Sequence, residues 1–118
     1  MTNELVINGQ TYEFKFGMAF VREIDKRHIR ELNGMIQNIG LAYKVAELTD
    51  GNLEALFDVL YVANKGFTPR LEQSTFDAWV ENPDTDIEEV FKAVINFLEM
   101  SNCTKRITKQ ILTASQDI

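Results

Sequence analysis

The chain has 118 residues, of which 45% are hydrophobic and 25% charged, and this composition is typical of a single globular domain. Its formal net charge of −6 argues against a nucleic-acid-binding protein, because such proteins usually carry a basic excess. The N-terminus lacks the features of a secretory signal, no apolar run approaches the roughly 20 residues of a membrane span, and Cys103 is the single cysteine, so we expect a reduced cytosolic protein without membrane contact.

The first predicted element is a β-hairpin over residues 4–16. An Asn-Gly pair at positions 8–9 lies between two apolar runs, and this dipeptide favours a tight hairpin turn because both residues tolerate positive φ. The second strand alternates Tyr12, Phe14 and Phe16 with charged residues, which places the three rings on one face. Because a lone two-stranded hairpin is marginal in water, we expect this face to pack on the helices that follow.

The rest of the chain is predicted to form a bundle of five to six helices, which makes the whole of residues 1–118 one mainly α domain. Apolar residues recur with helical periodicity, most regularly between Ile87 and Leu98. Asn52 is the expected N-cap of one helix, and a capping box at Thr85 or Asp86 is expected to begin another. An Asn-Gly pair at 33–34 is expected to break the first two helices apart. The predicted helices cover residues 18–32, 35–48, 53–65, 74–81, 87–100 and the segment from about 104 onward.

No arrangement of catalytic residues is evident in the sequence. His28 is the only histidine, and we expect it to be a surface or half-buried helical residue and not a general base. Cys103 lies at the junction of the last two helices, where a structural role is expected. The acidic stretch "DTDIEE" lacks the glycine and the glutamate of a calcium loop and suits a helix N-terminus instead. We therefore predict a non-enzymatic protein with no cofactor and no metal site.

Protein binding is the remaining class of function. Aromatic and branched apolar side chains are common in interface cores. Those near a loop or on the last helix are the candidate contacts with a partner, although they would equally complete the core. They are Phe67, Trp79, Ile107, Ile111 and Leu112.

Charge is distributed unevenly along the second half of the chain. The stretch from Glu72 to Glu89 holds seven acidic residues and no basic one, whereas the last helix carries Lys105, Arg106 and Lys109 and no acidic one. Opposite charges on different surfaces favour head-to-tail self-association, which builds open assemblies when it does not close into a ring. The alternative is that both stretches are ordinary solvated surfaces.

Four segments in order resemble the short tail assembly chaperones of long-tailed bacteriophages of Gram-positive bacteria and of their prophages. They are the hairpin "INGQTYEFKFG", the helix "FVREID", the turn "ANKGFTP" and the closing "FLEMSNCTK". The likeness covers residues from about 4 to 110, and the stretch "RELNGMIQNIGLAY" departs from it. The order and spacing of the four segments together are more specific than any one of them.

This resemblance implies a function in virion assembly. Such chaperones coat the long, largely helical tape-measure protein, keep it soluble while the tail tube forms, and are absent from the finished particle. A longer form, made by ribosomal frameshifting, recruits tail-tube subunits, and the family tends to form homo-oligomers in the host cytoplasm. The alternatives from the residues alone are a small helical adaptor or regulator that binds a protein, and a nucleic-acid-binding regulator that relies on "TKRITKQ".

Overall fold

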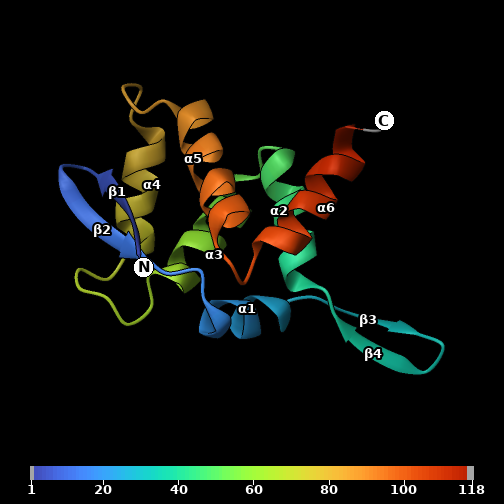
Figure 1. Cartoon of the computed structure of the whole chain (residues 1–118). Coiled ribbons are helices and arrows are strands. Elements are labelled where there is room, and N and C mark those ends of the chain that lie inside the picture. Colours follow the sequence, from blue (N-terminus) through green and yellow to red (C-terminus); the bar gives the residue numbers. More distant parts are fainter. Residues whose placement is uncertain (1, 117–118) are drawn as a thin grey trace.

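The computed structural model describes residues 2–116, and within that range it contains six α-helices and two antiparallel β-hairpins (Figure 1). The predicted mainly α fold with an N-terminal hairpin is confirmed. No helix of the described residues is long and apolar enough to cross a membrane. The elements are β1 (Asn3–Ile7), β2 (Gln10–Phe14), α1 (Met18–Asp25), β3 (Ile29–Leu32), β4 (Met35–Asn38), α2 (Gly40–Thr49), α3 (Leu53–Ala63), α4 (Gln73–Glu81), α5 (Ile87–Met100) and α6 (Lys105–Gln116).

The N-terminal hairpin forms as predicted. Asn8 and Gly9 take φ values of 52° and 79°, the two positive values that a tight two-residue turn between antiparallel strands requires. The ring of Phe14 is fully buried, and that of Phe16, just beyond the strand, meets Phe20 of α1 edge to face with ring centroids 5.1 Å apart. The aromatic face therefore joins the hairpin to the helices.

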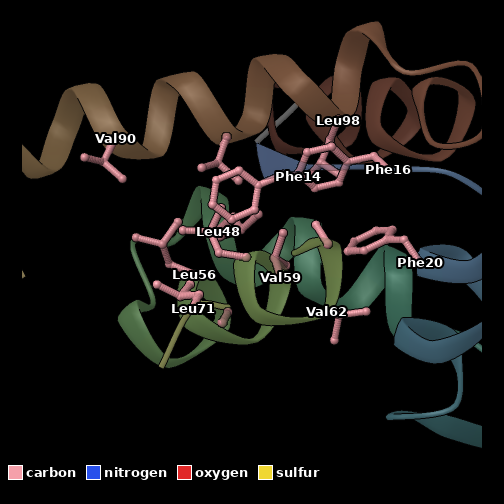
Figure 2. Close-up of a cluster of buried hydrophobic side chains, with 14 of the residues drawn as sticks. Phe14, Phe16, Phe20, Leu48, Leu56, Val59, Val62, Leu71, Val90 and Leu98 are labelled. Carbon is pink, nitrogen blue, oxygen red and sulfur yellow. The ribbon is translucent and has the colours of Figure 1, made fainter. Parts of the chain in front are cut away.

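The core lies between α5 on one side and α2 and α3 on the other, and Figure 2 shows Phe14 of the hairpin reaching between them. Leu48 of α2, Leu56 of α3 and Leu98 of α5 are each at most 1% exposed. Burial of one such leucine stabilises the fold by about 1.5–3 kcal/mol. The hairpin and helices α1 to α5 thus share a single core, which α6 covers from the side of α2 and α5.

Residues 26–38 contradict the sequence-based prediction. The first helix ends at Asp25 and not at residue 32, and the second begins at Gly40 and not at residue 35. Between them β3 and β4 form a second hairpin, because Asn33 and Gly34 take φ values of 53° and 80° and make the same turn as the first Asn-Gly pair. Ile29, which falls within the predicted helix 18–32, lies in β3 and is 61% exposed. We call this hairpin, Ile29–Asn38, the arm, and Figure 1 shows it projecting from the bundle.

The remaining helices lie close to their predicted positions. Asn52 caps α3, since its side-chain oxygen accepts a hydrogen bond from the backbone N–H of Ala55 at 3.0 Å. Asp86 caps α5 in the same way, through the N–H of Glu89 at 3.2 Å. Local signals were sufficient here because each cap involves residues three apart in the chain.

Candidate protein-binding surfaces

The five predicted contact residues do not form one surface. Trp79 is 8% exposed and packs edge to face on Phe76, with ring centroids 6.2 Å apart. Ile107 and Ile111 are half-buried against the core, and Leu112 beside them is also half-buried. In the free chain these residues of α4 and α6 complete the packing of the domain. The fifth residue, Phe67, lies elsewhere.

Phe67 lines an apolar groove between the start of α1 and the end of α3. The groove has a volume of about 370 Å³. Met18 at its mouth is 48% exposed, and an ion pair between Lys65 Nζ and Glu23 Oε2, 3.2 Å apart, lies at its rim. Such a groove can take an apolar side chain of a partner while the rim charges meet polar groups around it. We call it the α1–α3 groove; its lining includes Gly17, Met18, Ala19, Phe20, Val62, Ala63, Gly66 and Phe67.

Asn64 holds the loop that carries Phe67. The residue is fully buried, and its Nδ2 donates hydrogen bonds to the backbone oxygens of Glu13 at 2.9 Å and Pro69 at 3.3 Å. Its Oδ1 accepts from the N–H of Leu71 at 2.6 Å and from Arg70 Nη1 at 2.9 Å. One side chain thereby joins β2 to the loop before α4. Sequence reasoning missed it, because an asparagine after a helix is an ordinary end signal.

The arm is the second exposed apolar surface. Its side chains Ile29, Leu32, Met35 and Ile36 are 61%, 51%, 66% and 72% exposed. Leu32 lies directly opposite Met35 on one face, and the alternation of side chains along each strand places the two isoleucines on the other face. Each face therefore presents two large apolar side chains to solvent, beside two polar or charged ones. The Asn-Gly turn was the signal that predicts this hairpin, and it was interpreted only as a helix break.

The base of the arm is held firmly. The N–H of Leu41 donates to Asp25 Oδ1 at 2.8 Å, and the N–H of Ile39 donates to the backbone oxygen of His28 at 2.9 Å. The rings of His28 and Tyr43 stack with centroids 4.1 Å apart. His28 is half-buried as expected, but it lies between α1 and β3 and not on a helix. These contacts fix the direction in which the arm leaves the body.

A cluster of ionic side chains lies beneath this base. Lys44 is only 7% exposed, with its Nζ 3.0 Å from Asp58 Oδ2 and 3.2 Å from Glu47 Oε1. Arg27 Nη1 lies 3.5 Å from the other oxygen of Asp58. Burial lowers the pKa of Lys44, but its interactions with Asp58 and Glu47 outweigh that effect and leave the pKa above its ordinary value of 10.5. The cluster links α2 and α3 to the residues that precede the arm.

Replacing Lys44 with methionine is expected to lower the free energy of unfolding by about 1–2 kcal/mol at neutral pH, because the two carboxylates lose their partner but remain partly solvated. The folded-state pKa is raised, so the stabilisation is complete below about pH 10.5 and is lost as the pH rises through the folded-state value. Urea denaturation at pH 7 and pH 11 should show the difference from wild type shrinking at the higher pH. Lys92→Met, which removes an exposed ion pair with Glu89, is the control, and it should change the free energy of unfolding little. Equal effects of the two changes at pH 7 would contradict a structural role for Lys44.

The predicted charged surfaces are exposed. Lys105, Arg106 and Lys109 lie on the outside of α6, and Cys103 lies in the α5–α6 connection, also exposed. Among residues 2–116 no three His, Cys, Asp or Glu side chains are arranged to hold a metal ion. All seven acidic residues of the stretch from Glu72 to Glu89 are exposed, and they lie on α4 and the residue before it, on the α4–α5 connection and in the first turn of α5. We call this stretch the acidic flank.

A family model described as "Phage tail assembly chaperone protein, TAC" matches residues 4–113. Comparison with curated proteins and with solved structures finds no match. The matched range contains the arm, the α1–α3 groove and the acidic flank.

Proposed function

The chain belongs to the phage tail assembly chaperone family, and on this premise we propose that it binds the tape-measure protein and keeps it soluble while the tail tube assembles. It acts by binding and not by catalysis, in the host cytoplasm, and leaves before the virion is complete. A longer frameshifted form recruits the tail-tube protein. The family match and the two exposed apolar surfaces support this proposal.

The α1–α3 groove is the surface that best fits such a client. A long helical protein presents apolar side chains once per turn, and helix-in-groove binding inserts these into apolar pockets. The groove has apolar walls, with Met18 exposed at its mouth and Phe67 half-buried in its lining. Lys15, Glu23 and Lys65 at its edge offer charges of both signs to the polar side of the client helix. Each groove binds a short stretch of the tape-measure protein. Many copies of the chaperone bound along one tape-measure protein therefore supply the total affinity.

Co-expression with the tape-measure protein of the same phage tests the proposal. The wild-type chain should keep the tape-measure protein in the soluble fraction and co-purify with it. The double change Met18→Ser and Phe67→Ser is expected to reduce the co-purified amount at least about tenfold, which corresponds to a loss of about 1.4 kcal/mol of binding free energy from the two apolar anchors together.

Met100→Ser is the matched control, because Met100 is 74% exposed and lies outside the groove. It should retain wild-type binding. Thermal unfolding of each variant checks that the fold survives, since Phe67 is half-buried. If the folded double variant rescues the tape-measure protein as well as Met100→Ser does, the groove is not the client site. If neither the wild-type chain nor its longer form keeps that protein soluble, the proposed function is wrong.

A further inference from the structure

We propose that a pocket between α3 and the loop before α4 binds the carboxylate of an acidic side chain on a partner protein. We call it the Arg70 pocket; its lining residues are Phe57, Tyr61, Arg70, Leu71, Glu72 and Gln73. It shares no lining residue with the α1–α3 groove, although the same loop supplies Phe67 to the groove and Arg70 to this pocket. The proposal therefore goes beyond the client groove and does not depend on the tape-measure protein.

The guanidinium of Arg70 is fixed by three contacts. Its Nη1 donates hydrogen bonds to the backbone oxygen of Tyr61 at 2.7 Å and to Asn64 Oδ1 at 2.9 Å. Its Cζ lies 3.9 Å from the centroid of the Tyr61 ring, which covers one face of the guanidinium plane. Asn64 is fully buried, so its side chain is a rigid support. A cation that is fixed before its ligand arrives loses little conformational entropy on binding.

The other edge of the guanidinium has no partner within residues 2–116. Nε and Nη2 donate to no acceptor there, and none of the ion pairs in this range includes Arg70, although the chain has 18 acidic residues. The Nε–H and one N–H of Nη2 point the same way and can donate parallel hydrogen bonds to the two oxygens of one carboxylate. Such a ligand lies in the plane of the guanidinium, so the stacked ring of Tyr61 does not obstruct it. These open donors identify the ligand as a carboxylate.

Aromatic rings give the pocket an apolar wall beside the cation. Phe57 is half-buried and Tyr61 is 38% exposed, and their ring centroids lie 5.3 Å apart. The pocket has a volume of about 320 Å³, which is at the lower end of the roughly 300–1,000 Å³ of ligand sites. It can take one acidic side chain together with the apolar side chain next to it. The wall favours a segment of protein over a small ion, because only the segment covers the rings.

Glu72 at the edge of the pocket opposes the ligand. Its side chain is exposed and forms no ion pair with Arg70. A carboxylate that enters the pocket is repelled by Glu72, and a phosphate, which meets the same donors with a larger charge, is repelled more. The pocket therefore favours the singly charged ligand, and removal of the Glu72 charge should strengthen binding.

Two blocked tripeptides that differ only in charge test the proposal. They are acetyl-Leu-Glu-Leu-amide and acetyl-Leu-Gln-Leu-amide, each titrated into the full, isotope-labelled chain. Binding is followed by the chemical shifts of the Arg70 Nε–H and of the backbone N–H groups of Leu71 and Gln73. The peptide with glutamate should saturate these shifts and bind at least about tenfold more tightly than the peptide with glutamine, because hydrogen bonds between charged groups in a fixed geometry contribute this much.

Three variants separate the guanidinium geometry from general attraction between charges. Arg70→Lys keeps the positive charge and removes the parallel donors, so the preference for the peptide with glutamate should fall to about twofold. Glu72→Gln should bind that peptide about twofold more tightly than wild type. Arg106→Lys, at an exposed position of α6 outside the pocket, is the matched control and should bind as wild type does. Thermal unfolding checks that Arg70→Lys keeps the fold.

Three results would overturn the carboxylate site. They are equal binding of the two peptides to the wild-type chain, an unchanged preference in folded Arg70→Lys, and tighter binding of inorganic phosphate than of the peptide with glutamate. If Arg70→Lys unfolds, Glu72→Gln still decides, since weaker binding by that variant contradicts the assigned ligand.

The outcome is separable from that of the co-expression experiment. The tripeptides contain no tape-measure sequence, so equal binding of the two leaves the α1–α3 groove and the proposed function unaffected. Loss of the proposed function leaves the measured preference for a carboxylate, and with it the Arg70 pocket, unchanged.

Discussion

Gly40→Ala is expected to lower the free energy of unfolding by about 3 kcal/mol or more, a larger effect than any surface change in this chain. A Cβ atom at position 40 would lie 1.8 Å from the backbone oxygen of Ile24 and 2.8 Å from the Cα of Asp25. Both obstacles are backbone atoms, which cannot rotate away as a side chain can. The start of α2 must then separate from the end of α1, and overpacking of this kind is costly. The same movement displaces the base of the arm.

Urea denaturation of Gly40→Ala and of Gly17→Ala measures this effect. A Cβ at Gly17 meets only the side chain of Lys15, at 3.3 Å, and that flexible chain can move aside. The free energy of unfolding of Gly17→Ala should therefore stay within about 1 kcal/mol of the wild-type value. Similar stabilities for the two variants would show that α1 and α2 are not closely packed at Gly40.

Asn64→Ala is expected to lower the free energy of unfolding by about 3–4 kcal/mol. The change leaves the N–H of Leu71 and the backbone oxygens of Glu13 and Pro69 without this partner, and each unsatisfied buried group costs about 1–3 kcal/mol. The loop that follows α3 should loosen before the rest of the domain unfolds. Phe67 lies in that loop, so client binding through the groove should weaken as well.

Asn82→Ala is the matched control for this change. Asn82 also accepts a backbone hydrogen bond, from Asp84 at 2.9 Å, but it is exposed and water can replace it. Asn82→Ala should therefore lower the free energy of unfolding by less than about 1 kcal/mol. Denaturation gives the global stability, and hydrogen exchange at the Leu71 amide reports the loop. Wild-type exchange at Leu71 in Asn64→Ala would contradict the role assigned to this side chain.

Signals that act over a few residues were sufficient for much of the fold. The Asn-Gly turn at 8–9, the Asn52 cap and the apolar periodicity from Ile87 to Leu98 each depend on neighbours in the chain, and each predicted the element that forms. The Asn-Gly pair at 33–34 carries the same turn signal, but the residues on either side of it also fit a helical pattern, which predicts two helices with a break between them. The hairpin at residues 29–38 forms instead, because the turn signal prevails over that helical pattern.

Burial and the grouping of distant residues were decided only by the tertiary structure. The sequence determined that the domain is mainly α, begins with an aromatic hairpin and carries an acidic stretch, because turn chemistry, periodicity and charge are local properties. It did not distinguish the half-buried Phe67, which lines a groove, from Trp79, which is buried, since both are aromatic residues near a loop. Nor did it show that Asn64 joins segments 51 residues apart, or that the arm and the acidic flank lie at opposite ends. Those features arise from the packing of helices on one another, which brings together residues that no local pattern relates.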